Sequence, residues 1–318
     1  MSKTHPNLAI IIVSYNTCHM LKACLRSVYA GLAHFPAEAQ VWVVDNASTD
    51  GSPDVVRAEF PQAQLLALEQ NLGFAAGNNA ALREMGFGAT ASHQAHDVLF
   101  LNPDTEVQGS ALTHMADVLH NTEKAGIVGA SLVYPDGRFQ HSAFHFPTLW
   151  QIWFDFFPRP VRLLDTRLNG RYSRALYQAE QPFAIDHPLG AAMMTRAEVI
   201  HQVGLMDEGY FMYAEEIDWC LRVREAGWDI YCVPTAQIVH HAGGSTRQFR
   251  DKMFVALWRS RFRLFRKHYG PAFNLVARQL VRLGLSAEMR RARRTESDAA
   301  LERRLSAYRQ VWDLARTR

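Results

Sequence analysis

Short apolar runs and amphipathic stretches alternate through the first 130 residues, and this alternation narrows the possible folds more than any other feature. Residues 8–13 are continuously apolar and mostly β-branched, which predicts a strand buried on both faces. Residues 19–30 carry apolar side chains at helical spacing. The pattern then repeats, with strands predicted at 40–44, 64–68 and 97–101 and helices at 52–60, 74–85 and near 110–119. Such alternation favours an α/β fold with a mostly parallel sheet covered by helices on both faces.

Polar residues stand at the ends of the predicted strands. They are Tyr15 with Asn16, Asp45 with Asn46, Asn71, and Asn102 with Asp104. Ligands of such sheets bind at the carboxyl ends of the strands, so we expect a binding crevice there. No G-x-G-x-x-G motif follows the first strand and no P-loop motif occurs in the sequence. Dinucleotide binding and a P-loop nucleotide site therefore lose their main support.

The second half of the sequence is less regular. The alternation stops between 139 and 183, where aromatic residues are frequent. This insertion can be a lid, a surface for an apolar partner, or local core. Beyond it the pattern predicts a strand at 183–195 that contains Gly190, a helix at 214–226 and a strand at 230–233.

Positive charge is concentrated in the last part of the chain. Residues 247–318 hold 19 Lys and Arg against 6 Asp and Glu, a net charge of +13, whereas residues 1–246 carry −10. We therefore distinguish a region 1–246 from a basic helical C-terminal region, 247–318. The mixture of apolar and basic residues at 249–269 resembles an interfacial amphipathic helix. Residues 272–285 are too few and too rich in arginine to span a bilayer.

This charge suits an anionic membrane surface or nucleic acid, although charge runs are usually solvated helix faces. The four cysteines, Cys18, Cys24, Cys220 and Cys232, lack C-x-x-C spacing, which favours a reducing, cytoplasmic setting. The apolar run near the N-terminus is short and has no small-residue cleavage site. It predicts a core strand and not a signal peptide or membrane span.

Asp104 and His240 are candidate ligands of a divalent cation. A carboxylate at a strand end can coordinate a hard cation that bridges the phosphates of a nucleoside diphosphate. An Asn-Pro-Asp sequence is also an ordinary turn, and a lone histidine is more often structural. Taken together, the two ligands mix nitrogen with oxygen, which favours Mn²⁺ over Mg²⁺.

Three acids, Glu215, Glu216 and Asp218, stand at the start of the helix predicted at 214–226. Acids stabilise a helix start, and Asp218 can pair with Arg222 one turn later, so two of the three need no function. A carboxylate desolvated by the neighbouring aromatic residues would be a general base for a sugar hydroxyl.

Asp45 has two interpretations. It can belong to an ordinary turn before a helix, or it can accept the imide N–H of a pyrimidine on which Tyr15 stacks.

Seven blocks in order give the sequence a resemblance to the inverting family 2 glycosyltransferases, and most closely to their rhamnosyltransferase-like branch. They are IIVSYN (11–16), VVDNASTDGS (43–52), NLGFAAGNN (71–79), VLFLNPDT (98–105), LGAAMMTR (189–196), GYFMYAEEIDWCLRVREAG (209–227) and HHAGGST (240–246). The resemblance covers about the first three quarters of the chain. It implies a GT-A fold, a nucleotide-sugar donor, a divalent cation, Mn²⁺ or Mg²⁺, and a single displacement with inversion.

Carried over by position, the resemblance also assigns site residues. Glu216 is the catalytic base, with Glu215 and Asp218 in reserve because the usual base of the family is aspartate. Asp104 and His240 hold the metal, and Asn102 stands in place of the first aspartate of the D-x-D motif. The donor-binding residues are Tyr15, Asn16, Asp45, Asn46, Asn71, Gly73, Phe74, Asn78, Asn102 and Gly190.

The implied activity is metal-dependent transfer of a sugar, L-rhamnose from dTDP-rhamnose, to a saccharide or lipid-linked saccharide in cell-surface polysaccharide synthesis. The same chemistry with UDP-GlcNAc or UDP-galactose stays open, because sugar choice depends on pocket shape. We expect the protein in the cytoplasm, at the inner face of the plasma membrane, with an anionic membrane surface as partner. No nucleic acid is expected, because nothing in the basic region resembles a known nucleic-acid-reading motif. The alternative function from another class is a non-catalytic protein that binds nucleic acid through the basic region.

Overall fold

The predicted alternation of strands and helices is present in the computed structural model, which describes residues 7–88, 96–158, 160–242, 250–295 and 298–316. The first half of the chain forms elements within a few residues of those predicted. They are β1 (Asn7–Ser14), α1 (Cys18–Leu32), β2 (Ala39–Asp45), α2 (Ser52–Glu59), β3 (Gln64–Ala67), α3 (Phe74–Glu84), β4 (His96–Leu101) and α4 (Ala111–Asn121). The short strand β5 (Thr105–Val107) was not predicted.

A ten-stranded sheet forms the centre of this part, in the order β3-β2-β1-β4-β11-β6-β12-β5. Two short strands pair beside this row, β7 (Phe139–Gln140) with β6 and β9 (Phe183–Ala184) with β12. Strands β3, β2, β1 and β4 are parallel, and so are β6 (Ala125–Val133) and β12 (Asp229–His240). Strand β11 (Ala192–Thr195) lies antiparallel between β4 and β6. The fold is therefore the mostly parallel α/β arrangement that the alternation predicts.

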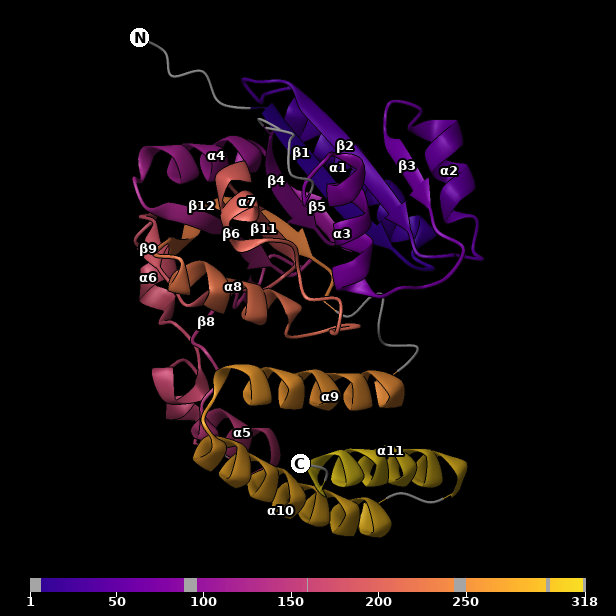
Figure 1. The fold of residues 1–318 in the computed structure, drawn as a ribbon, viewed down its shortest axis with the longest axis vertical. Coiled ribbons are helices and arrows are strands. Elements are labelled where there is room, and N and C mark those ends of the chain that lie inside the picture. Colours follow the sequence, from indigo (N-terminus) through magenta and orange to yellow (C-terminus); the bar gives the residue numbers. More distant parts are fainter. Residues whose placement is uncertain (1–6, 89–95, 159, 243–249, 296–297, 317–318) are drawn as a thin grey trace.

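Helices cover both faces of the sheet because its central strands are buried on both sides. In β1, Leu8, Ile10 and Ile12 face α1, α2 and α4 in one core. Their neighbours Ala9, Ile11 and Val13 face α3, α7 (Ala197–Val203) and α8 (Glu215–Glu225) in the other. Figure 1 shows these two layers on either side of the sheet.

The aromatic insertion at 139–183 folds into short elements that join the rest of the molecule. They are β7 (Phe139–Gln140), β8 (Ala143–Phe144), α5 (Leu149–Phe156), η1 (Val161–Leu163), η2 (Arg167–Asn169), α6 (Arg174–Gln178) and β9 (Phe183–Ala184). Phe156 stacks on Trp258 with ring centroids 5.3 Å apart, as the local-core interpretation predicts. Trp150, by contrast, is 58% exposed.

The single strand predicted at 183–195 is wrong. The segment forms β9, β10 (His187–Pro188) and β11, and each of them pairs with a different strand, namely β12, β8 and β4. The chain must change direction between these partners, so the segment cannot run straight. The turn between β10 and β11 contains Gly190.

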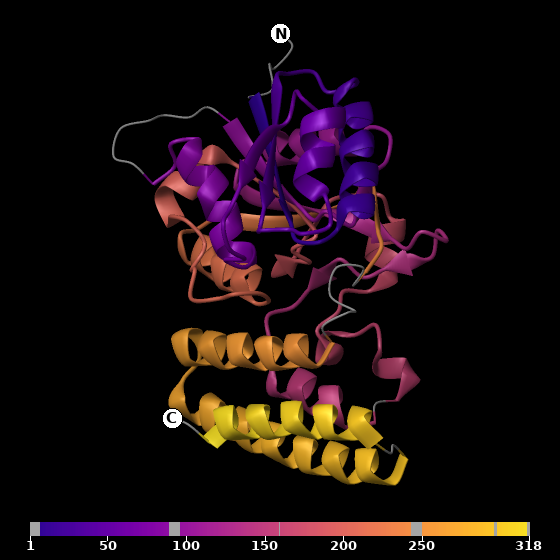
Figure 2. The same ribbon diagram turned by 90° about the vertical axis from the view of Figure 1, so that its right-hand side faces the viewer.

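Three helices complete the chain: α9 (Arg250–His268), α10 (Pro271–Thr295) and α11 (Asp298–Arg316). They pack with α5 around a third core, below the sheet in Figures 1 and 2. Trp258 and Phe265 of α9 are each 1% exposed in this core. The prediction that 249–269 is an interfacial helix is therefore wrong, because its apolar face packs against other helices of the same chain.

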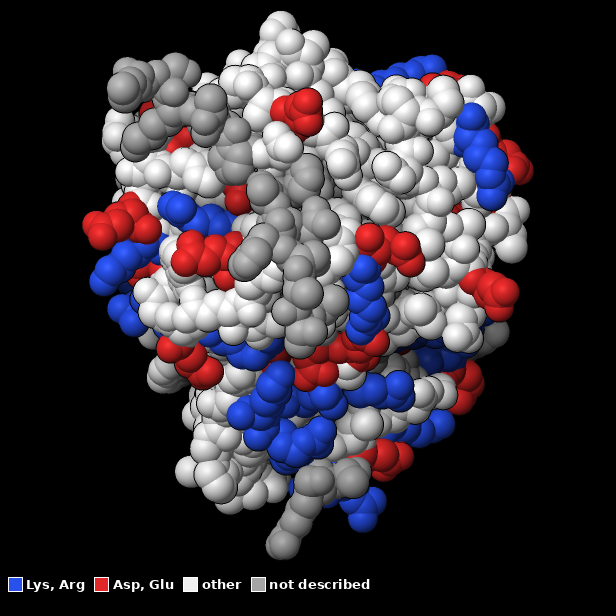
Figure 3. Space-filling view, turned by 45° about the horizontal axis from the view of Figure 1, so that its top comes forward, with Lys and Arg blue, Asp and Glu red and all other residues white. Residues whose placement is uncertain are grey.

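Ion pairs join these helices to the sheet-bearing part. Asp207 accepts from Arg263 at 2.9 Å and from Lys267 at 3.0 Å, and Lys267 lies 2.7 Å from Asp218. Figure 3 shows basic side chains gathered on the helical part, with acidic ones at its border with the sheet-bearing part. Part of the charge difference between the two regions is thus neutralised inside the molecule. None of the described helices has the length and apolarity needed to cross a bilayer.

Candidate active site

A cavity of about 460 Å³ opens between the carboxyl ends of β1 and β4 and the start of α9. Its walls combine strand ends, the loops at 71–73, 189–191 and 211–213, the start of α8 and the start of α9. The lining residues are Val13, Ser14, Tyr15, Asn46, Asn71, Gly73, Phe74, Asn102, Pro103, Asp104, Leu189, Gly190, Ala191, Phe211, Met212, Tyr213, Glu215, Glu216, His240, Lys252 and Met253.

Asp104 and His240 face each other in this cavity. Antiparallel pairing of β12 with β5 sets His240 opposite Thr105, and its Nε2 lies 3.6 Å from Oδ1 of Asp104. That Oδ1 is buried and has no hydrogen-bond partner in the described part of the chain. Burial lowers the pKa of His240 despite the nearby Asp104 charge. The imidazole is therefore neutral at neutral pH, which is the form that binds metals.

The pair fits a divalent cation that takes its other ligands from a substrate. Within the residues described, no group of three or more His, Cys, Asp or Glu side chains is placed to hold a metal. Mg²⁺ is commonly held by one or two protein carboxylates together with waters and substrate phosphates, and does not require a full protein cage. One carboxylate oxygen without a partner and one neutral imidazole match that pattern.

Glu215 and Glu216 begin α8 and line the cavity beside this pair. One oxygen of each, Oε2, is buried without a hydrogen-bond partner among the described residues. Burial raises the pKa of Glu216 to about 7. The pKa of Glu215 is raised further above its usual range, by burial and then by the Glu216 charge. Glu216 can therefore change its protonation state near neutral pH, as a general base should.

Asp218, the third acid of this helix, has a different environment. Its side chain is fully buried, is not among the cavity residues and interacts with Tyr210, Arg222, Lys267 and His268. Burial opposes its ionisation, but the hydrogen bonds from Lys267 and His268 lower its pKa overall. The predicted pair with Arg222 is confirmed at 3.1 Å. These contacts fit a carboxylate that fastens α8 to α9, and they do not favour Asp218 as the base.

The backbone before α8 is held in an unusual conformation. Tyr213 and Ala214 have left-handed φ angles of 69° and 65°, which non-glycine residues rarely adopt. The loop is fixed at Phe211, whose carbonyl oxygen accepts a hydrogen bond from Phe74 N–H at 2.8 Å. A Cβ on Gly73, where φ is +87°, would lie 2.1 Å from that oxygen. Only glycine permits this contact, which sets the 71–74 loop against the start of α8.

Seven of the ten residues that the resemblance assigns to the donor line the cavity, and Asn16, Asp45 and Asn78 do not. Asn16 accepts a hydrogen bond from Thr49 N–H at 2.8 Å and so ties the end of β1 to the next loop. Oδ2 of Asp45 accepts from Ser48 N–H at 2.8 Å, while its buried Oδ1 has no partner in the described chain. Asp45 thus stabilises the turn with one carboxylate oxygen, and its other oxygen is buried outside the lining of the cavity.

The start of α9 was missed at the level of sequence. Lys252 and Met253 of α9 line the cavity, and so does the 211–213 loop, whose aromatic residues were expected beside the acids of α8. Lys252 adds a cation to the lining of the cavity. Of the block at 240–246, His240 is described, whereas residues 243–246 lie outside the described residues.

The fold and the site together define a class of protein. Two solved glycosyltransferases share the fold: a mannosyltransferase from Pyrobaculum calidifontis in complex with GDP-Man and Mn²⁺, and GalNAc-T7 with UDP, GalNAc and Mn²⁺. The first has a TM-score of 0.57 at 18% identity and covers 99% of this chain and 85% of its own. The second has a TM-score of 0.59 at 11% identity and covers 98% of this chain and 57% of its own. The fold is GT-A, the fold of these two glycosyltransferases.

The chain belongs to glycosyl transferase family 2, whose model matches residues 9–204. It is 28% identical over 247 residues to the N-acetylglucosaminyl-diphospho-decaprenol L-rhamnosyltransferase of Mycobacterium tuberculosis, covering 75% of this chain and 77% of that protein. It is 23% identical over 239 residues to the dTDP-rhamnosyl transferase RfbF of Shigella flexneri, covering 74% of this chain and 70% of that protein. The prediction of an inverting, rhamnosyltransferase-like family member is thereby confirmed.

Proposed function

We propose that the protein transfers L-rhamnose from dTDP-rhamnose to a lipid-linked saccharide in the synthesis of a cell-surface polysaccharide. The observation that carries this proposal is the meeting of Asp104, His240 and Glu216 around one cavity. The choice of donor rests on the relatives, one of which is named for dTDP-rhamnose. The choice of acceptor rests on the Mycobacterium tuberculosis relative, whose name specifies a diphospho-decaprenol-linked sugar.

In the proposed mechanism Glu216 accepts the proton of an acceptor hydroxyl while the hydroxyl oxygen attacks the anomeric carbon. The bond from that carbon to the diphosphate oxygen breaks on the opposite face, so the configuration inverts. Asp104 and His240 would hold a divalent cation, Mn²⁺ or Mg²⁺, which when bound neutralises charge on the departing nucleoside diphosphate. Lys252 lines the same cavity and adds positive charge near the diphosphate.

A thermal-shift panel of nucleotide sugars tests the donor. With Mn²⁺ present, dTDP-rhamnose should raise the melting temperature more than UDP-GlcNAc or UDP-galactose does. A ligand at 100 times its Kd stabilises the folded state by about 2.7 kcal/mol, so the shift is a few degrees. EDTA is the control, and it should remove most of the shift. A larger shift with UDP-GlcNAc or UDP-galactose would identify that sugar nucleotide as the donor in place of dTDP-rhamnose. The absence of a shift with any nucleotide sugar would contradict sugar transfer.

The same proposal places the protein in the cytoplasm, against the anionic inner face of the plasma membrane. The apolar face of α9 is unavailable for this contact, but α10 offers another surface. Leu275, 62% exposed, lines a cavity of about 670 Å³ together with Arg266, Arg278 and Arg282. An exposed apolar side chain among arginines suits the headgroup layer of an anionic membrane.

Vesicle sedimentation tests this surface. Wild-type protein should pellet with phosphatidylglycerol vesicles and much less with phosphatidylcholine vesicles, and Leu275→Glu should reduce pelleting several-fold because it places a charge in the contact. Leu168→Glu is the matched control, since Leu168 is 45% exposed and belongs to η2. Equal pelleting of wild type and Leu275→Glu would remove this surface from the proposal.

A further inference from the structure

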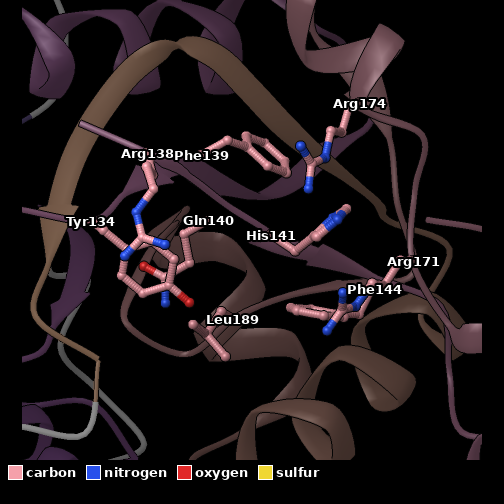
Figure 4. Close-up of a pocket in the computed structure, with 9 residues that line it drawn as sticks. All are labelled: Tyr134, Arg138, Phe139, Gln140, His141, Phe144, Arg171, Arg174 and Leu189. Carbon is pink, nitrogen blue, oxygen red and sulfur yellow. The ribbon is translucent and has the colours of Figure 1, made fainter. Parts of the chain in front are cut away.

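A second cavity, of about 580 Å³, lies beside the candidate active site and has no part in the chemistry proposed above. It is basic and aromatic, and Figure 4 shows its side chains converging from two stretches of the chain, 134–144 and 171–174, and from Leu189. Its cations are Arg138, Arg171 and Arg174. Its aromatic walls include Tyr134 and Phe144.

The two cavities share a wall. Leu189 lines both, and the next residue, Gly190, faces Glu216: a Cβ built there would lie 3.5 Å from Cβ of Glu216. On another side, Gln140 lines the basic cavity and contacts Nδ1 of His240 at 3.1 Å. A molecule that filled both cavities would therefore pass directly beside the candidate base.

The charge of the second cavity favours an anion. Arg174 pairs with Asp165 at 2.9 Å, Arg171 lies 4.0 Å from the same carboxylate, and Arg138 pairs with Asp136 at 2.7 Å. The described residues that line the cavity include these three guanidinium groups and no carboxylate. Arginine is the side chain best suited to bind phosphate, because its planar fork donates two parallel hydrogen bonds.

His141 supplies a polar atom without a partner in this cavity. Its side chain is 8% exposed, and its Nε2 contacts Asp165 at 2.8 Å. Its Nδ1 is buried and has no hydrogen-bond partner within the described ranges. A buried polar atom without a partner is costly unless a ligand or water satisfies it. With Nε2–H directed to Asp165, Nδ1 can accept a hydrogen bond from a ligand hydroxyl.

We infer that this cavity is the acceptor subsite and that it binds the phosphate-bearing end of the acceptor. Phosphate oxygens accept hydrogen bonds from Arg138 and Arg171, the sugar packs on the aromatic wall, and a sugar hydroxyl reaches Glu216 past Leu189. This inference rests on the proposed function, which already names a lipid-linked acceptor, and adds to it the cavity and the residues that bind the phosphate of that acceptor.

Calorimetry with three acceptor analogues tests the inference without requiring sugar transfer. The titrants are octyl-diphosphate-linked N-acetylglucosamine, N-acetylglucosamine 1-phosphate, and octyl N-acetylglucosaminide, which is neutral. Arg138→Ala and Arg171→Ala should each weaken both phosphorylated ligands by about 10-fold or more, because charge-assisted hydrogen bonds are lost. The affinity for the neutral glycoside should not change. If octyl-diphosphate-linked N-acetylglucosamine binds and N-acetylglucosamine 1-phosphate does not, the ligand is lipid-linked. If the two bind with similar affinity, the sugar phosphate is sufficient for binding.

Two variants serve as controls. Arg57→Ala removes an exposed arginine that pairs with Asp54 at 3.0 Å on α2, and it should bind all three ligands as wild type does. Arg138→Lys keeps the charge and should recover part of the affinity. The inference is overturned if wild type binds no phosphorylated ligand, if the two alanine variants bind it normally, or if they weaken the neutral glycoside equally. If phosphate-dependent binding holds but no sugar is transferred, the proposed function fails, and the cavity stands as a phosphate-binding site without the role of an acceptor subsite.

Discussion

Replacing Glu216 by Gln should lower the turnover number by about 10²- to 10⁴-fold, the range that general-base help contributes. The amide is nearly isosteric with the carboxylate but cannot accept the proton of the acceptor hydroxyl. Donor affinity should stay close to wild type, because Glu216 acts on the acceptor. Steady-state kinetics with saturating donor, together with nucleotide titration, measure both effects.

The pH dependence of the wild-type enzyme belongs to the same prediction. Burial raises the pKa of Glu216 to about 7, and only the ionised form can take a proton. The rate should therefore rise as pH increases through about 7, and the Glu216→Gln variant should lose this limb. Glu216→Asp should recover part of the activity, because it restores a carboxylate on a shorter side chain.

Glu215→Gln is the matched control, since Glu215 is the adjacent acid, is buried and also has an oxygen without a partner in the described chain. Its turnover should fall much less than that of Glu216→Gln. A larger loss of turnover in Glu215→Gln than in Glu216→Gln would assign the role of general base to Glu215. Near-normal turnover in Glu216→Gln would remove Glu216 from the mechanism.

Replacing Asp104 by Ala should abolish metal-dependent donor binding. The carboxylate oxygen that faces His240 would be lost, and a single neutral imidazole is a weak site for Mn²⁺ or Mg²⁺. Turnover should fall by about 10²-fold or more, because a bound cation stabilises the transition state by several kcal/mol. Calorimetry of donor binding with and without Mn²⁺ measures the direct effect.

Two comparisons make the Asp104 test specific. His240→Ala should lose less, because the carboxylate remains as the charged ligand. Asp136→Ala removes an acid of similar size on an exposed turn and should leave metal-dependent binding as in wild type. If Asp104→Ala binds the donor with the wild-type dependence on Mn²⁺, the cation lies elsewhere.

Much of the fold follows from local pattern, and β6 shows where pattern fails. Strand β1 was predictable because its residues are large, β-branched and buried on both faces. Strand β6 is equally buried but contains Gly126 and Gly129, which weaken a strand signal. A Cβ on Gly129 would lie 2.4 Å from Cβ of Pro188, so the small residue is needed for a contact with a segment about 60 residues away. That contact has no trace in the local sequence.

The candidate site divides in a similar way. Residues at strand ends could be grouped from the sequence, because parallel strands end at one edge of a sheet. Lys252 could not be assigned, since its place depends on how α9 packs against Tyr210 and Ala214. The arginines of the second cavity were also beyond reach, because short strands and turns with little periodicity bring them together. The interfacial interpretation of 249–269 failed because amphipathicity does not reveal which partner covers the apolar face.

Helix α9 has a consequence for how the chain should be divided. Its first turn presents Lys252 to the cavity, and its last turn presents Lys267 and His268 to Asp218 of α8, the helix that begins at Glu215. The helix therefore connects the two regions of the chain, with the cavity at its first turn and Asp218 of α8 at its last turn. The change in charge near residue 246 therefore marks a change in composition and not a functional boundary, because residues from both sides of it line the same cavity.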